Sequence, residues 1–136
     1  MTYNILPATT LTTAVTGSLS DTTYVTRPFQ SALIAATFAY GAGGTTCKAW
    51  VQCSADRGTT WHDVCNFSFT TTAAKAFFNI SGLTAVTSIG TPSDGTAANN
   101  AAVDGTLTNT WRVKLTTTGT YSGASSLTIW VCTRDT

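Results

Sequence analysis

The chain has 136 residues, a formal net charge of +1 and no glutamate. This length is typical of one domain, and we expect a single domain over residues 1–136. The near-neutral charge gives no electrostatic reason to expect nucleic acid or an anionic membrane as a partner. Threonine supplies 31 residues, while most good helix formers are scarce, so the composition favours strands.

Residues 1–20 are extended, threonine-rich and weakly alternating. They are typical of a first strand or of an extended N-terminal arm that docks on a neighbour. The segment has neither the basic region nor the sustained apolar core of a secretory signal, and no stretch reaches the ~20 apolar residues of a membrane-spanning helix. We therefore expect the protein to fold in a cytoplasm.

Phe29–Tyr40 is a nearly continuous apolar run that follows Pro28 and ends at Gly41–Gly44. A helix within this run is an alternative. Its aromatic and β-branched residues and the glycines after it favour a strand buried on both faces.

The stretch Ser54–Trp61 spells Ser-x-Asp-x-Gly-x-Thr-Trp and resembles the Asp-box of sialidases and other propeller proteins. In such a turn, Asp56 accepts hydrogen bonds from the backbone amides ahead of it, Gly58 adopts a positive φ, and Trp61 folds back onto the sheet. The box occurs once, in a chain far shorter than a propeller and with only four arginines. We interpret it as a structural turn between two strands and not as a sialidase site.

The two strands that flank this turn are predicted at Cys47–Cys53 and Trp61–Phe69. Alternation divides each strand into two faces. One face is expected to carry Cys47, Ala49, Val51 and Cys53 in the first strand, and Trp61, Asp63, Cys65, Phe67 and Phe69 in the second. The opposite face is expected to carry Lys48, Trp50 and Gln52, and His62, Val64, Asn66 and Ser68.

The four cysteines have no zinc-knuckle spacing. Cys47 and Cys53 lie roughly 20 Å apart along one strand and cannot pair. The turn places Cys53 and Cys65 out of register. We expect four reduced, mostly buried thiols; a long-range disulfide to Cys132 is the alternative.

Further along, Phe77–Ile80 is predicted as a short strand, and residues 84–106 as a long loop of small residues that is functional or mobile. Trp111–Leu115 and Leu127–Cys132 are the last predicted strands. About seven or eight short strands joined by glycine-rich turns indicate an all-β fold. We expect a two-sheet sandwich, like a jelly roll or a Greek key.

The sequence offers no evident chemistry. His62 is the only histidine, and its neighbour Asp63 points to the other face of a strand, so the two cannot easily act together. The six aspartates have no metal-ligand spacing, and Gly41–Gly44 lacks the lysine of a phosphate loop. We therefore predict no enzymatic activity, no catalytic or metal site and no cofactor.

The four tryptophans divide into two predicted core residues and two residues on possible interaction surfaces. Trp61 and Trp111 share faces with other apolar residues and are predicted in the core. Trp50 and Trp130 are predicted on the opposite faces, where a second layer or a loop covers them or a partner binds. A sugar-stacking platform, as in a carbohydrate-binding module, is a third alternative. Low charge and outward tryptophans lead us to predict a homo-oligomer, most simply a dimer, with Trp50 or Trp130 in an apolar interface.

The run from about Ala32 to Trp130 resembles small virion proteins of tailed bacteriophages. The matching segments are Leu33–Phe38, Ser54–Val64, Val103–Leu107 and Arg112–Tyr121. The resemblance implies a capsid decoration or cement protein, without catalysis or cofactor, that binds the major capsid protein on the outside of the head, often as an oligomer. It implies assembly in the host cytoplasm. A tail or fibre-associated β module is the alternative within the same resemblance.

Overall fold

The computed structural model describes residues 1–135, and within that range it contains strands and no helix. The long strands are β1 (Thr2–Thr10), β4 (Ser31–Ala39), β6 (Thr46–Ser54), β7 (His62–Phe69), β8 (Ala74–Ser81), β9 (Thr110–Thr118) and β11 (Ser126–Arg134). The two-residue strands are β2 (Ser18–Leu19), β3 (Thr23–Tyr24), β5 (Ala42–Gly43) and β10 (Tyr121–Ser122). The all-β prediction is confirmed, but the described residues form eleven strands where seven or eight were expected, because four two-residue strands add to the seven long ones.

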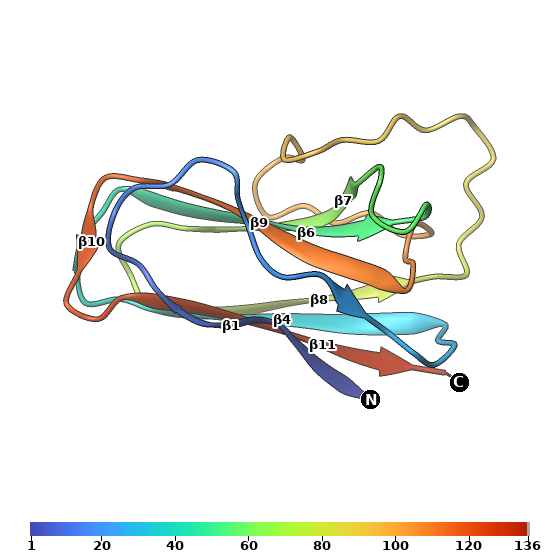
Figure 1. Ribbon diagram of the computed structural model, residues 1–136, viewed down its shortest axis with the longest axis horizontal. Coiled ribbons are helices and arrows are strands. Elements are labelled where there is room, and N and C mark those ends of the chain that lie inside the picture. The colour runs from blue at the N-terminus through green and yellow to red at the C-terminus, as the bar shows by residue number, and fades with distance from the viewer. Residues whose placement is uncertain (136) are drawn as a thin grey trace.

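The long strands form two sheets that pack face to face (Figure 1). One sheet has the order β1-β11-β4-β8, and the other has the order β2-β9-β6-β7, with β3 also paired to β9. The small strands β5 and β10 pair at one end of the molecule. The two-sheet sandwich is therefore confirmed, whereas the jelly-roll or Greek-key refinement stays a prediction.

The N-terminal segment contributes β1 to the first sheet and β2 to the second. β1 pairs with β11 in an antiparallel register that joins Thr2 to Cys132. Of the two alternatives for residues 1–20, the structure shows a first strand held within its own chain, and its edge carries Pro7 and two register shifts.

The core lies between the sheets, where one side of each long strand is buried. In β4 this side carries Ala32, Ile34, Ala36 and Phe38, each at most 1% exposed. The other side of β4 is half-buried or exposed. The prediction of burial on both faces is wrong for this strand, because a two-layer sandwich leaves the outer face of each sheet without a further layer.

The faces predicted for β6 are confirmed, but those for β7 are partly wrong. Val51 pairs with Cys65 and Gln52 pairs with Asp63, so Val64 is an extra residue in β7. Such a bulge reverses the alternation beyond it. Val64 is consequently buried in the core, and Asp63 lies on the outer face beside Gln52.

The same outer face holds Trp61. Trp111 is fully buried in the core, as predicted. Trp61 is also buried, but it lies outside the core cluster, with the Arg112 guanidinium 4.2 Å from its ring centroid. The prediction that Trp61 lies in the core is therefore wrong. The bulge reverses the side of the sheet on which the side chains at this end of β7 lie, so Trp61 is buried on the outer face.

Candidate interaction surface

Two exposed aromatic side chains lie in one row across the outer face of the sheet β1-β11-β4-β8. Trp130 in β11 pairs with Ala35 in β4, and Ala35 pairs with Phe77 in β8. Trp130 is 44% exposed and Phe77 is 71% exposed. Neighbouring strands lie about 4.8 Å apart, so the Cα atoms of the two aromatic residues are about 10 Å apart. Only the methyl group of Ala35 lies between the two side chains.

The rows on either side of this one are small and almost uncharged. One row is Thr128, Thr37 and Lys75, and the other is Cys132, Leu33 and Asn79. We call these nine residues of the three rows the open face. Its single charge is Lys75, at the edge strand. Because the open face carries so little charge, the free-energy cost of removing water from it is small when a partner binds.

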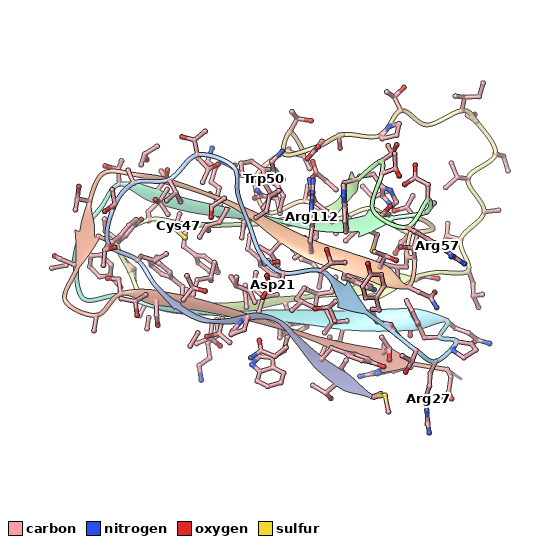
Figure 2. All side chains as sticks on the ribbon, viewed as in Figure 1. Asp21, Arg27, Cys47, Trp50, Arg57 and Arg112 are labelled. Atoms are coloured by element: carbon pink, nitrogen blue, oxygen red, sulfur yellow. The ribbon has the colours of Figure 1, made fainter. Side chains whose placement is uncertain are left out.

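The outer face of the second sheet is covered by the long loop, residues 84–106. Trp50 is only 9% exposed, and its indole Nε1 donates to the Ala97 carbonyl oxygen at 3.1 Å. Figure 2 shows Trp50 and Arg112 on the loop side of this sheet, whereas Cys47 points between the sheets. Of the alternatives for Trp50, the structure shows the covering loop, so the premise that Trp50 faces a partner is wrong.

One buried carboxylate holds the loop in place. Asp63, 4% exposed, accepts hydrogen bonds from the backbone amides of Gly95, Thr96 and Ala97 at 2.9–3.0 Å. It also accepts from the Gln52 amide at 2.8 Å and the Ser93 hydroxyl at 3.2 Å. Both oxygens of Asp63 are occupied by donors, which fits an anchor and leaves no free oxygen to act as a base.

The loop also satisfies the backbone at the free edge of β7. The Asp63 amide donates to Ser93, the Asn66 amide donates to Ala101, and the Val103 amide donates to Val64. The Ser68 amide donates to the Asn100 side chain at 2.9 Å. The loop therefore protects this sheet edge as an irregular extra strand would. The sequence predicts a loop that is functional or mobile. These hydrogen bonds favour a loop that is fixed on the sheet over a mobile one.

A charged cluster lies at the side of the same loop. Asp94 accepts from Lys114 at 2.7 Å and from the Gln52 amide at 2.7 Å, and Arg112 lies 3.6 Å away. The hydrogen bond from Lys114, and next the one from Gln52, lower the pKa of Asp94 below its ordinary value. Arg112 in turn donates to Gln52 at 2.7 Å. Each charged group is already paired, so the cluster fixes the loop on the sheet.

The Asp-box turn forms as predicted. The Asp56 carboxylate accepts from the Thr60 amide at 2.7 Å and from the Ser54 hydroxyl at 2.9 Å. Gly58 has a φ of 97°, and its carbonyl accepts from the Trp61 indole at 3.0 Å. These hydrogen bonds stabilise the turn itself, as the structural interpretation expects.

His62 lines a cavity of about 480 Å³ between β7 and the long loop, together with apolar residues such as Val86, Val103 and Leu107. Its Nε2 lies 2.7 Å from the Thr106 carbonyl oxygen, which can only accept, so Nε2 carries a hydrogen. Asp63 is committed to the loop amides and does not pair with His62. Among residues 1–135, no group of three His, Cys, Asp or Glu side chains is placed to hold a metal ion.

All four cysteines are free, as predicted. Cys47, Cys53 and Cys65 are buried, and Cys132 is half-buried on the open face. Burial raises the pKa of Cys47 and of Cys53 to about 12. The first three thiols therefore act as small apolar core residues.

Two features of these surfaces escaped sequence reasoning. The sequence predicts a strand at Phe77, but the exposure of Phe77 depends on β8 being an outer strand. The anchoring role of Asp63 depends on the bulge at Val64, for which the sequence carries no signal.

Among residues 1–135, no helix is long and apolar enough to cross a membrane. Comparisons with protein-family models, curated proteins and solved structures found no match.

Proposed function

We propose that this chain is a structural virion protein of a tailed bacteriophage, a capsid decoration or cement protein. It binds the major capsid protein on the outside of the head, after assembly in the host cytoplasm. The open face is the surface that makes the contact, with Trp130 and Phe77 as its central side chains. Binding at many equivalent sites then stabilises the shell by mass action, without catalysis or a cofactor.

The observation that carries this proposal is the pair of exposed aromatic rings on an almost uncharged sheet face. Tryptophan and other aromatic residues are enriched at the centres of protein interfaces, where they bury large areas at low entropic cost. Only one charge is added to this face by the rows on either side, which are Thr128, Thr37 and Lys75 in one and Cys132, Leu33 and Asn79 in the other. The resemblance of the sequence to small phage virion proteins supplies the identity of the partner.

The test is binding to phage heads that lack the protein. Phe77→Ala and Trp130→Ala should each weaken binding at least tenfold, since a truncated hot-spot aromatic typically costs more than ~1.4 kcal/mol. Tyr24→Ala is the matched control, because Tyr24 is 60% exposed but lies in β3 on the other sheet. Heads with the wild-type protein should retain DNA to a higher temperature than bare heads.

Three outcomes oppose the proposal. Equal binding by all three variants would exclude the open face as the contact. Density for this chain only on the tail or baseplate in electron cryo-microscopy of the virion would favour the tail-module alternative. Failure of the wild-type protein to bind either heads or tails would remove the virion proposal altogether.

The same aromatic pair favours a second candidate, a carbohydrate-binding module. Aromatic rings on a flat face stack against sugar rings, and Trp130 and Phe77 are spaced along one row. A glycan array separates the two candidates. Binding that is lost in Trp130→Ala and kept in Tyr24→Ala, with no affinity for heads, would establish the sugar-binding alternative.

A further inference from the structure

The sandwich has four sheet edges, and three of them are protected. β1 carries Pro7 and two register shifts. The long loop occupies the free backbone groups of β7. On the remaining side of that sheet, β2 and β3 have two residues each. Irregular, covered or very short edge strands are the usual defences against pairing with another chain.

The fourth edge, β8, is straight and open. Its register with β4 runs from Ala74 to Ser81 without a shift. The Ser81 amide donates to Asp104 and its carbonyl accepts from Gly105, so Ser81 faces away from β4. Gly82, the next residue, donates toward β4 at Gln30.

Backbone direction alternates along a strand, so the orientation of Ser81 fixes that of the other residues. Lys75, Phe77 and Asn79 direct their N–H and C=O groups to the free edge, while the residues between them bond to β4. Within residues 1–135, no backbone hydrogen bond outside the β4 ladder engages these three residues. All three side chains are exposed.

We propose that a second copy of this chain pairs with this edge, β8 against β8, antiparallel about a two-fold axis at Phe77. Phe77 then lies opposite the partner's Phe77, and Lys75 lies opposite the partner's Asn79. Every free N–H and C=O group of the three residues gains a partner. The β1-β11-β4-β8 sheets of the two copies become one continuous sheet across the dimer. This inference does not rest on the proposed function.

The charge of Lys75 and the length of β8 favour the axis at Phe77 over axes at nearby residues. An axis at Lys75 would set two lysines directly opposite each other, which is destabilising. An axis at Asn79 would bring the partner strand against Ser81, whose backbone groups are already used by Asp104 and Gly105. An axis at Ala76 would pair Asn79 with a residue before the start of the partner strand. The axis at Phe77 pairs all open groups and separates the lysines.

The side chains support the same arrangement. Phe77 is the most exposed aromatic side chain of the protein, and pairing places two such rings side by side. Cross-strand aromatic pairs stabilise antiparallel strands. The open face of one copy would also continue into that of the other, so that Trp130 and Phe77 of both copies lie in one row. A pairing this short buries little area and is expected to be weak in solution.

The first experiment is sedimentation velocity from ~10 µM to ~1 mM, a range suited to a weak dimer. The wild-type protein should shift from monomer to dimer over this range. Asn79→Pro should stay monomeric, because proline removes an N–H that points to the free edge and not to β4. Asn79→Ala is the matched control, which keeps the N–H and should dimerise as the wild type does.

The second experiment tests the register and does not depend on a proline variant that folds. Asn79→Asp should tighten the dimer at least twofold at low salt, because it faces Lys75 of the partner subunit, and Asn79→Lys should weaken it by a similar factor. In a Cys132→Ser background, Phe77→Cys should form an intermolecular disulfide under mild oxidation. Lys75→Cys, which faces the partner's Asn79, should not.

A monomeric wild-type protein at ~1 mM would overturn the inference. So would a dimer unaffected by Asn79→Pro in a folded variant, or equal disulfide trapping at Lys75→Cys and Phe77→Cys. Head binding by the wild-type protein, measured at concentrations where sedimentation shows a monomer, separates failure of the dimer from failure of the proposed function.

Discussion

Trp50 and Trp130 hold equivalent places in the two sheets, yet they end in different environments. Each lies on the outer side of an interior strand, Trp50 in β6 and Trp130 in β11. Trp50 is 9% exposed and Trp130 is 44% exposed. The difference is the long loop, which packs on one sheet only. An outward tryptophan in a sandwich therefore indicates either a docking surface or a place where the chain covers itself.

The largest expected effect comes from removing the anchor of the covered face. Asp63→Ala leaves several buried amide donors without an acceptor, and we expect a loss of about 3 kcal/mol in the free energy of unfolding. Chemical denaturation measures this loss, and quenching of tryptophan fluorescence reports the uncovering of Trp50. Asp21→Ala, at an exposed position, is the control. A loss below about 1 kcal/mol for Asp63→Ala would mean that the loop holds without its anchor.

Within the loop, two glycines sharpen the comparison between fixed and free segments. Gly105 has a φ of 86°, and a Cβ there would lie 2.2 Å from the Thr84 carbonyl oxygen. Gly105→Ala should therefore cost about 2 kcal/mol. Gly90 has nothing within 4 Å of such a Cβ, and Gly90→Ala should leave the unfolding free energy unchanged. Similar thermal midpoints for the two variants would contradict this contrast.

The Asp-box turn lies at the end of the covered sheet, and its glycine should have a smaller effect. Gly58→Ala forces an alanine into a φ of 97° and should cost about 1 kcal/mol. Asp56→Ala should lower the thermal midpoint as well, because the Thr60 amide loses its acceptor. Loss of secondary structure in either variant, instead of a lower midpoint, would assign this turn a larger role.

Acid should loosen the covered face slightly. The pKa of Asp94 is lowered, first by the hydrogen bond from Lys114, so the folded state favours the ionised carboxylate. That stabilisation is present above the ordinary carboxyl pKa of about 4 and is lost as the pH falls through the lowered value. Asp94 is half exposed, so the effect is small. Amide exchange of the loop between about pH 5 and 2.5 measures it, and Asp94→Asn should remove the part of the dependence that Asp94 contributes.

A small effect on stability is also expected on the open face. Trp130→Ala should change the unfolding free energy by less than about 0.5 kcal/mol, because substitutions on an unpartnered surface rarely cost more. Thr128→Ala, one row away, serves as the reference for the same strand. A loss above about 2 kcal/mol in denaturant would show that Trp130 supports the fold and is not reserved for a partner.

The same comparison shows which parts of the structure were predictable from the sequence. Alternation from Cys47 to Cys53 identified the inner and outer faces of β6, because a straight strand keeps a period of two. The bulge at Val64 broke that rule in β7. Residues 84–106 have no strand pattern, so their packing over Trp50 depends on side chains that are distant in sequence, above all Asp63. The sequence predicts a strand at Phe77, but only the order of strands in the sheet makes Phe77 an edge residue.

The pairing of β1 with β11 also has a consequence for how the protein folds. It joins Thr2 to Cys132, so the first sheet lacks its second strand until β11 has left the ribosome. β6 and β7 are the one pair of long strands that can meet early, as a hairpin. Topologies dominated by such distant pairings fold in milliseconds to seconds. During that interval the apolar sides of β4 and β8 are uncovered, so this architecture favours rapid closure of the first sheet once β11 has been synthesised.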